Sequence, residues 1–518
     1  INYMLRSLDP YTVYYPEEKV KDLDLMISGK YAGIGALIRY NFLLKNTVID
    51  EPYENMPAAE VGLKKGDVIL AIGDSSMVGK DVAYVSNHLR GDAGTTFILT
   101  IQRPSVNKKM KFKITRRAIQ LPAVPYYGVQ DGGVGYLNLN SFTTGCAKDV
   151  RRAFLDMKKQ GITSLVFDLR NNGGGSLQEA VNIVNMFVPK GITLVKTVGK
   201  MERANKEYKT TVEPIDTVMP IVVLVNDETA SASEITSGSL QDLDRAVVLG
   251  TRTYGKGLVQ VSMDLPYNGN LKLTSSKYYI PSGRCIQAIN YKHANGGYTE
   301  HVPDSLTHVF HTANGREVRD GGGIKPDVEV RPDSLPNIAF YLASSGRDST
   351  EVMWNWELQY LKKHPTIGPA KTFVISDADF EDFKQAVLKS GFKYDRESKK
   401  YLENLVKLAK FEGYYDDAKG EFDALEKKLN HNLAKDLDYN KQTLKKVLTS
   451  DLVSAYYYQK GSLENSLQFD KQWNKAVEIL KNPVEYKKLL QPVVGQPLVK
   501  LEPASNVAVD KKQKSKAK

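Results

Sequence analysis

Residues 164–175 read SLVFDLRNNGGG, an apolar run that ends in a polar turn with three consecutive glycines. An apolar run of this length, bounded by turn residues and followed by a helix, predicts a strand that is buried on both faces. Residues 221–225, IVVLV, repeat the arrangement, again before a turn and a helix. Such strand–turn–helix units predict an α/β domain, and two of them side by side aim both turns at one cleft.

The α/β pattern covers residues 120–335, and the chain on either side has a different character. Upstream, residues 57–72 predict a short helix, a glycine turn and a strand, and two later segments alternate like paired strands, 97–101 and 111–114. Downstream, the chain is rich in lysine and glutamate with helical periodicity. We therefore expect five segments: a helical lead-in at 1–30, a β-rich module at 31–119, the α/β domain at 120–335, a helical extension at 336–495 and a basic, disordered tail at 496–518.

Length and composition fit a soluble protein of two to four domains. The chain has 518 residues, of which 42% are hydrophobic and 25% charged. No apolar run approaches the ~20 residues of a membrane-spanning helix. Because the sequence begins at Ile1 and not at Met, we expect a mature or trimmed product whose targeting segment lies outside it. The net charge of +11 lies partly in the tail, which predicts a solvated end, with weak attraction to nucleic acid or an anionic membrane as the alternative.

Two cysteines and seven histidines give no support for a metal site. Cys146 and Cys285 exclude a disulfide scaffold and a multi-cysteine zinc site; one disulfide stays open, but we expect two free thiols. Four histidines lie between His293 and His311, without HExxH-type spacing, and predict a polar loop. We expect no metal and no cofactor.

The segment TASASE, residues 229–234, follows the apolar run 221–225 and begins a predicted helix. The first N–H groups of a helix are unpaired, so a serine there lies beside donors that can stabilise an oxyanion. Ser231 and Ser233 are both candidates for a nucleophile. The alternative is that a serine at this place only caps the helix.

A serine nucleophile needs a base, and Lys256 is the notable candidate because glycines flank it in TYGKG, residues 253–257. Glycines let the backbone approach another element closely, which would bury the lysine. Burial disfavours the charged amine and lowers a pKa that is ordinarily ~10.4. The alternative is an exposed lysine in a β-turn.

Taken together, these segments resemble the carboxyl-terminal processing peptidases, also called tail-specific proteases. The resemblance covers about residues 1–330, and its motifs occur in the family's order and spacing: 168–175, 231–235, 240–242, 245–246, 253–257, 278–284 and 323–328. One departure is Cys285, where the family pattern has serine. A second nucleophile is the alternative reading of this cysteine, but we expect a small buried residue.

The resemblance implies a role for individual residues. Ser231 takes the position of the nucleophile, and Lys256 that of the general base. Gln260 resembles the residue that orients the lysine. The N–H of Ala232 and that of a glycine in the 173–175 run, Gly174 or Gly175, would line the oxyanion hole.

Two acidic residues on the same predicted helix complete the comparison. Asp242 matches an acidic position implicated in the bacterial branch of the family, in a role that is either catalytic or structural; it lies about three turns after Ser231. Glu234 lies about one turn after the serine. The choice of Ser231 over Ser233 rests on the family register alone.

Residues 31–119 resemble the PDZ domain of the family. The loop Gly33, Ile34, Gly35, Ala36 stands where PDZ domains bind a C-terminal carboxylate with backbone N–H groups, and the strand from Leu37 would pair with the substrate tail by β-augmentation. A glycine-rich turn of any β domain is the alternative, and the pattern at 57–72 favours PDZ.

The resemblance implies a serine endopeptidase of multidomain α/β fold, with a crotonase-like (ββα) core. It would capture unstructured C-terminal tails of proteins and cleave them through an acyl-enzyme, in the periplasm or elsewhere outside the cytoplasm. No nucleic acid is implied, while membrane association and a homo-oligomer stay open. Two other readings are a catalytically silent PDZ scaffold and an acyl hydrolase or acyl-CoA enzyme. The retained Ser231 and Lys256 argue against the first, and the PDZ module against the second.

Overall fold

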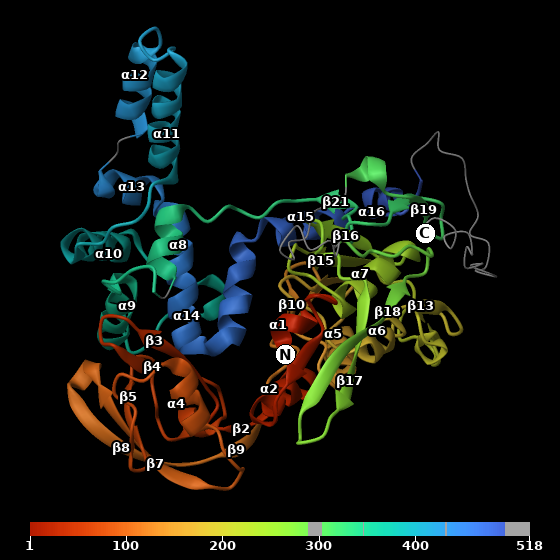
Figure 1. Ribbon diagram of the computed structural model, residues 1–518, viewed down its shortest axis with the longest axis horizontal. Coiled ribbons are helices and arrows are strands. Elements are labelled where there is room, and N and C mark those ends of the chain that lie inside the picture. Colours follow the sequence, from red (N-terminus) through yellow and green to blue (C-terminus); the bar gives the residue numbers. More distant parts are fainter. Residues whose placement is uncertain (289–302, 345, 430–431, 493–518) are drawn as a thin grey trace. The chain divides into compact units, whose positions relative to one another are not determined.

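The computed structural model of the chain describes residues 1–288, 303–344, 346–429 and 432–492, and it divides into two compact units (Figure 1). The first unit holds residues 1–30, 120–332 and the described chain from Asp470; the second holds 31–119 and 333–469. The predicted helical extension, 336–495, is thus divided between the units. The predicted tail at 496–518 lies outside the described residues.

A six-stranded sheet forms the centre of the first unit. Strands β10 (Tyr126–Gln130) and β11 (Val134–Asn138) are antiparallel, and the others continue in parallel: β12 (Ser164–Asp168), β15 (Ile221–Val225), β16 (Val247–Gly250) and β21 (Val328–Glu329). β12 and β15 lie side by side and are buried throughout, as their apolar runs predicted. The mixed α/β fold is confirmed.

Helices cover this sheet and share its core. The connections supply α5 (Cys146–Lys159), α6 (Leu177–Val184) and α7 (Ala232–Asp242), whose apolar faces pack in one cluster with the strands. Two late helices, α15 (Lys471–Leu480) and α16 (Pro483–Leu489), also belong to the unit. The ring of Trp473 meets Tyr136 edge-on, and the hydroxyl of Tyr486 bonds to the backbone of Ile221. The end of the predicted extension therefore packs on the α/β sheet.

A second sheet in the first unit involves the N-terminal segment. Its order is β1 (Val13–Tyr15), β18 (Asn270–Tyr279), β13 (Thr193–Gly199) and β14 (Lys206–Lys209), and β17 (Leu258–Asp264) also pairs with β18. The helices of the lead-in are α1 (Asn2–Leu5) and α2 (Glu17–Ser28). The strand between them, β1, was not predicted, and it brings residues 9–15 to β18. A small hairpin, β19 (Val309–His311) and β20 (Glu317–Arg319), completes the unit.

The β-rich part of the second unit is a sheet with two short helices. The strands are β3 (Ala36–Asn41), β4 (Asn46–Pro52), β5 (Val68–Ile72), β7 (Thr96–Arg103) and β8 (Lys108–Thr115), in that order, with β6 (Ser75–Ser76) beside β5. The helices are α3 (Pro57–Glu60) and α4 (Val82–Leu89). The predicted helix, turn and strand at 57–72 are confirmed, as is the pairing of the segments 97–101 and 111–114. Where the chain enters and leaves this module, β2 (Lys30–Gly33) pairs with β9 (Arg117–Gln120).

The rest of the second unit is helical. It comprises α8 (Asn337–Ala343), α9 (Val352–Lys363), α10 (Asp377–Ser390), α11 (Glu397–Glu412), α12 (Lys419–Leu429), α13 (Leu433–Tyr439) and α14 (Lys441–Ser466). Trp354 of α9 packs against Val48 and Val68 of the sheet, and the cations of Arg39 and Lys65 lie 4.5 and 4.6 Å from its ring centroid. The β-rich module and these helices therefore form one packed unit. No helix among the described residues is long and apolar enough to cross a membrane.

Candidate active site

Ser231 lies where the turn after β15 enters α7. Its backbone has φ 58° and ψ −116°, a conformation that residues other than glycine rarely adopt and that clusters at functional sites. Ser231 is partly exposed, whereas Ser233 is fully buried and its Oγ donates to the carbonyl oxygen of Asn172 at 2.8 Å. Of the two candidate serines, Ser231 is the accessible one.

The carboxylate of Glu234 joins the Ser231 turn to the Lys256 loop. It is fully buried and accepts hydrogen bonds from the N–H of Ser231 at 2.8 Å, of Gly255 at 2.7 Å and of Lys256 at 2.9 Å, as well as from the hydroxyl of Thr253 at 2.6 Å. Burial raises the pKa of Glu234, although these hydrogen bonds oppose the shift. One side chain thus fixes the backbones of both predicted dyad residues.

Tyr278, near the end of β18, makes a second bridge between the same two residues. Its hydroxyl donates to the carbonyl oxygen of Lys256 at 2.8 Å and lies 3.4 Å from that of Ser231. The side chain is 1% exposed, so the bridge is made in the interior. No role was predicted for Tyr278 from the sequence, and its place in the motif at residues 278–284 is the only sequence signal that points to it.

Lys256 lies in surroundings that favour its neutral form. Burial lowers the pKa of its amine from 10.5 to about 8, and the positive charge of Lys272 adds to the shift, while Glu234 and Asp9 oppose it. The amine nitrogen lies 4.6 Å from the ring centroid of Tyr11. This covering residue comes from the N-terminal segment, which the sequence analysis did not connect with the site.

The two glycines beside Lys256 allow the close approach that their sequence predicted. A Cβ at Gly255, where φ is +86°, would lie 2.4 Å from the Cβ of Ala288. A Cβ at Gly257 would lie 2.8 Å from the backbone nitrogen of Gln287. The segment 287–288 therefore packs directly on the lysine loop, and larger residues at either glycine would displace it.

The glycine run after β12 lies against the Ser231 turn. A Cβ at Gly174 would lie 2.8 Å from the Cβ of Ser231 and 2.9 Å from the nitrogen of Ala232. However, the N–H of Gly174 already donates to Oδ1 of Asn172 at 2.9 Å. Gly174 therefore supplies space beside the serine, which leaves Ala232 and Gly175 as the candidate oxyanion donors. The buried Asn172, which lies in the 168–175 motif but for which no role was predicted, anchors this turn.

Gln260 of β17 belongs to a chain of hydrogen bonds that ends near the lysine. Its amide nitrogen lies 3.3 Å from Oγ1 of Thr274, whose hydroxyl donates to Asp9 at 2.9 Å. Asp9 also accepts from the N–H groups of Tyr11 and Thr12, both at 2.8 Å. Through Thr274 and Asp9, Gln260 therefore helps to hold the N-terminal segment whose Tyr11 covers Lys256.

Asp242 is the last residue of α7, and its partners lie in the turn after β18. Its carboxylate accepts from the guanidinium of Arg284 at 2.7 Å and from the N–H of Ser282 at 3.0 Å. Asp242 and Arg284 are 0% and 1% exposed. Asp242 lies eleven residues after Ser231, which corresponds to roughly 16 Å along the helix axis.

The residue after Arg284 is Cys285, a free thiol, as is Cys146. Burial raises the pKa of Cys285, which disfavours the nucleophilic thiolate.

The predicted peptide-binding loop lies at the start of β3, which is an edge strand of its sheet. Ile34 is 3% exposed and shares a core with Val85 and Leu89 of α4, so a loop, an edge strand and a helix meet here. At Gly35 φ is +71° and a Cβ would lie 2.5 Å from the Cβ of Met56, so this position requires glycine. Leu37 is 46% exposed. This arrangement suits strand addition by a peptide.

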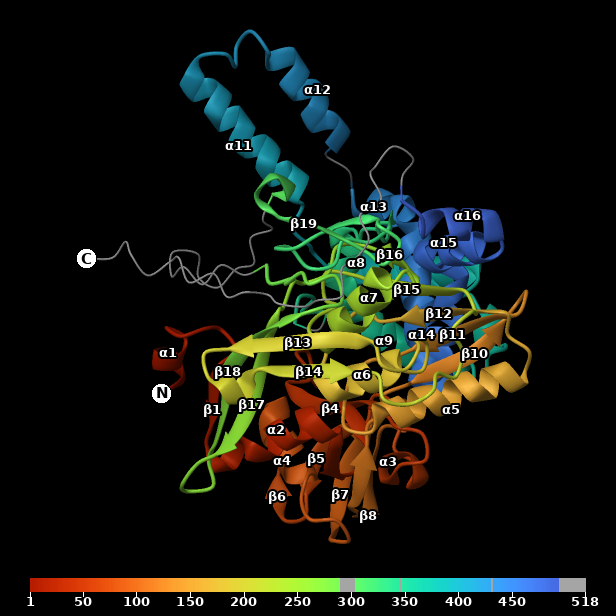
Figure 2. The ribbon, with the colours of Figure 1, turned by 90° about the vertical axis from the view of Figure 1, so that its right-hand side faces the viewer.

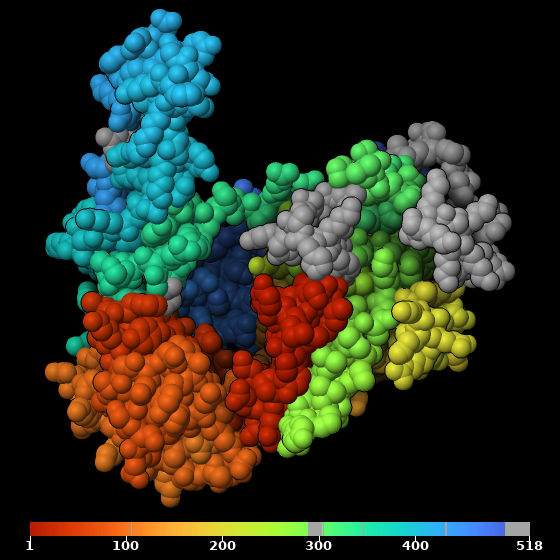
Figure 3. Space-filling view, viewed as in Figure 1, coloured from red at the N-terminus to blue at the C-terminus, as the bar shows by residue number. Residues whose placement is uncertain are grey.

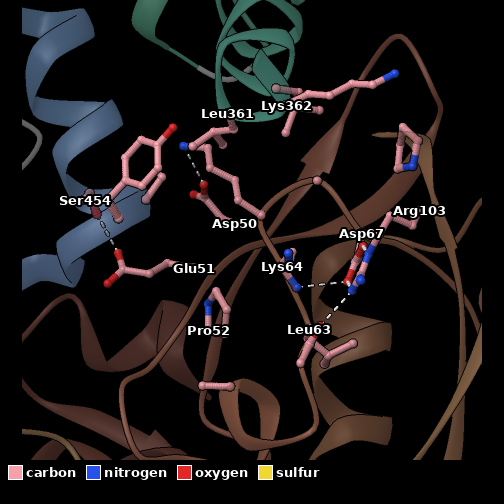
Figure 4. A pocket seen from close by; sticks show the side chains of 18 of the residues that line it. Asp50, Glu51, Pro52, Leu63, Lys64, Asp67, Arg103, Leu361, Lys362 and Ser454 are labelled. Atoms are coloured by element: carbon pink, nitrogen blue, oxygen red, sulfur yellow. Dashed lines mark hydrogen bonds and ion pairs between the residues drawn. The ribbon is translucent and has the colours of Figure 1, made fainter. Parts of the chain in front are cut away.

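A cavity of about 810 Å³ lies in the same unit, between this sheet and helices α9 and α14 (Figure 4). Leu37 and Pro52 line it from the sheet, and Leu361 and Ser454 line it from the helices. Glu51 accepts a hydrogen bond from the Ser454 hydroxyl at 2.9 Å across the cavity wall. Because Leu37 belongs to β3, the cavity adjoins the predicted peptide-binding strand.

Comparisons with known proteins identify three similar domains along the chain. Residues 133–293 match "Peptidase family S41", residues 48–103 match "PDZ domain", and residues 341–480 match "Probable PDZ-protease, C-terminal helical domain". The "Carboxy-terminal-processing protease" of Bartonella bacilliformis is 37% identical over 294 residues, which are 56% of this chain and 66% of that protein. A "Probable CtpA-like serine protease" of Staphylococcus aureus is 31% identical over 416 residues, 79% of this chain and 70% of that protein.

The chain spans less than two thirds of the first relatives it matches, 66% of the Bartonella protein and 57% of a "Probable CtpA-like serine protease" of Staphylococcus epidermidis. Among solved structures, "Photosystem II D1 C-terminal processing protease" is 28% identical, with 65% of this chain and 82% of that chain covered and a TM-score of 0.36. The chain belongs to peptidase family S41, with the carboxy-terminal-processing proteases, and combines an S41 peptidase domain with a PDZ domain and a C-terminal helical domain.

Proposed function

We propose that this chain is a serine endopeptidase in which Ser231 is the nucleophile and Lys256 the general base. The observation that carries the proposal is the pair itself: a serine at a strained helix start, tied through Glu234 to a lysine whose pKa is lowered to about 8. A base with a pKa near the working pH is well suited to proton transfer. The burial of Ser233 supports the choice of Ser231.

The proposed reaction is acyl transfer. Neutral Lys256 takes the proton from Oγ of Ser231 as this oxygen attacks the scissile carbonyl carbon. The N–H groups of Ala232 and Gly175 stabilise the resulting oxyanion. The Lys256 ammonium then gives its proton to the leaving amine, which breaks the peptide bond and leaves an acyl ester on Ser231. Lys256 next activates water, which hydrolyses the ester.

The other predicted residues have supporting roles in this proposal. Asp242 is structural, because its carboxylate pairs with Arg284 and holds the turn after β18. Gln260 and Asp9 hold the N-terminal segment whose Tyr11 covers the lysine. The core would be of the crotonase-like ββα type, an assignment supported by the order β10, β11, α5 at the edge of the parallel sheet.

The PDZ domain would select the substrate. An unstructured C-terminal tail adds to the free edge of β3, and its carboxylate meets the backbone of the loop from Gly33 to Ala36. The substrates would be protein or peptide tails, and the working place would be the periplasm or another extracytoplasmic compartment, on the strength of the family. Fractionation of cells that make the protein tests the compartment.

Cleavage of a peptide with an apolar C-terminal residue tests the chemistry. Wild type and Ser233→Ala cleave it, whereas Ser231→Ala and Lys256→Ala do not, although both inactive variants still bind the peptide. Mass spectrometry of a rapidly quenched reaction shows the acyl group on Ser231. Full activity of Ser231→Ala or Lys256→Ala refutes the dyad. A folded wild type that binds tails and cleaves none supports the silent scaffold instead.

A further inference from the structure

The helical hairpin formed by α11 and α12 buries very little of itself. Leu402 and Ala409 are the buried side chains of α11, and α12 has none. The hairpin projects beyond α13 of its own unit in both ribbon views (Figures 1 and 2), and the space-filling view shows it as a free-standing column (Figure 3). Helices of this length are marginal in water unless an apolar face is packed. Within the part of its unit that the structure describes, the hairpin therefore packs little apolar surface.

One face of α11 carries exposed apolar side chains at helical spacing. Tyr401, Leu405, Leu408 and Phe411 are 72%, 50%, 50% and 89% exposed, and Tyr414, which follows the C-cap of α11, is 67% exposed. Positions separated by three and four residues form one stripe along a helix. We call these five residues the outer stripe. Together they expose roughly 600 Å² of side chain, close to the ~800 Å² that each partner contributes to a standard interface.

The charges of the hairpin are divided between its tip and its stem. The tip, residues 411–423, has five acidic residues and one lysine, which is a net charge of −4. The stem, residues 397–410 and 424–429, has six lysines and three glutamates, which is a net charge of +3. The whole hairpin is thus nearly neutral in a chain whose net charge is +11. A surface that binds anionic lipid or nucleic acid would be basic throughout, so neither is the partner indicated.

From these observations we infer that the hairpin pairs with the hairpin of a second copy of this chain, in antiparallel orientation about a two-fold axis. The two outer stripes pack together into a four-helix arrangement. The acidic tip of each copy lies beside the basic stem of the other, whereas parallel pairing would place two tips of charge −4 side by side. The inference does not depend on the proposed protease chemistry.

Analytical ultracentrifugation of the full chain at concentrations from about 1 to 200 μM tests the pairing, because a dimer with an interface of this size is expected to dissociate within that concentration range. Wild type forms a dimer that weakens with added salt. Phe411→Glu places a charge in the apolar contact and weakens the dimer at least about tenfold. Its matched control is Tyr439→Glu, an aromatic-to-acid change at a residue of α13 that is 84% exposed and lies outside the stripe; it sediments as wild type does.

Charge reversal tests the orientation. Asp416→Lys/Asp417→Lys neutralises the tip and weakens an antiparallel dimer, whereas it would strengthen a parallel one. Lys399→Glu/Lys400→Glu makes the stem acidic and also weakens the dimer, and mixing the two double variants restores association between unlike copies. A wild type that stays monomeric throughout, or a dimer that Phe411→Glu leaves intact, overturns the inference. A stronger dimer in Asp416→Lys/Asp417→Lys overturns the antiparallel arrangement.

Discussion

The lowered pKa of Lys256 predicts how activity depends on pH. With a pKa of about 8 instead of 10.5, about one lysine in eleven is neutral at pH 7 rather than about one in 3,000, a ~300-fold difference in available base. The same shift corresponds to about 3 kcal/mol in favour of the neutral amine. We therefore expect kcat/KM to rise tenfold per pH unit below an inflection near 8 and to level off above it.

Lys272 provides the perturbation, because its charge lowers the pKa of Lys256. Lys272→Gln removes that repulsion, so the inflection moves upward, while burial keeps it below 10.5. Lys272→Arg keeps the charge and leaves the profile in place. The assay is kcat/KM from about pH 6 to pH 10.5 on a peptide without titratable side chains, with thermal unfolding measured at each pH. An inflection near 10.5, or one that Lys272→Gln leaves unmoved, would refute burial and repulsion as the means of activation.

Three further predictions concern buried carboxylates. Glu234→Gln keeps the shape of the side chain but replaces one carboxylate oxygen, so it accepts fewer hydrogen bonds from the N–H groups that it fixes, and kcat/KM falls about 100-fold. Because the negative charge of Glu234 raises the pKa of Lys256, its removal also moves the inflection of the pH profile to lower pH. An unchanged pH profile would contradict this prediction. Asp242→Asn leaves the buried Arg284 without its counter-ion and lowers the free energy of unfolding by about 3–5 kcal/mol. The double variant Asp242→Leu/Arg284→Met removes both charges, so it regains stability and stays active. A double variant that is stable but inactive would give Asp242 a catalytic role. Burial raises the pKa of Glu357, so this carboxyl group binds a proton on folding and the unfolding temperature falls as pH rises above the ordinary carboxyl range; Glu357→Gln flattens that fall, and an unchanged fall would place its origin elsewhere.

The strand–turn–helix units could be predicted because local pattern determines them. A buried parallel strand is apolar on both faces, and the polar turn must follow it directly, so SLVFDLRNNGGG and IVVLV each indicate a strand end. The close packing at Gly255 and Gly257 could also be predicted, because a glycine on each side of a lysine removes the side chains that would hold a neighbouring segment away.

The surroundings of the proposed dyad could not be predicted, because they come from distant parts of the chain. Thr274 and Asp9 are 265 positions apart, and the strand that joins them, β1, is only three residues long. Tyr278 and Glu234 are likewise ordinary residues of a strand and a helix until the fold brings both to Ser231 and Lys256. The accessible serine could not be chosen either, since Ser231 and Ser233 differ in backbone conformation and burial and not in local pattern.

Burial is the leading cause of both pKa shifts in the active site. It lowers the pKa of Lys256 and raises that of Glu234, so each group moves toward its neutral form. A carboxylate beside a lysine ordinarily favours the charged amine, and Glu234 does so in part. Its oxygens, however, are occupied by backbone N–H groups and the Thr253 hydroxyl, so in the proposed mechanism Glu234 positions Ser231 and Lys256 while burial sets the strength of the proposed base.

This division of roles has a measurable consequence. Substitutions that admit water to Lys256, such as Tyr11→Ala, raise its pKa and cost more activity at pH 7 than at pH 10. Substitutions that displace Ser231, such as Gly174→Ala, cost the same factor at both pH values, because a Cβ there would lie 2.8 Å from that of the serine. If both variants lost activity by the same factor across the pH range, exclusion of water would not be what lowers the pKa of Lys256. A fixed positive charge nearby would then have to lower it.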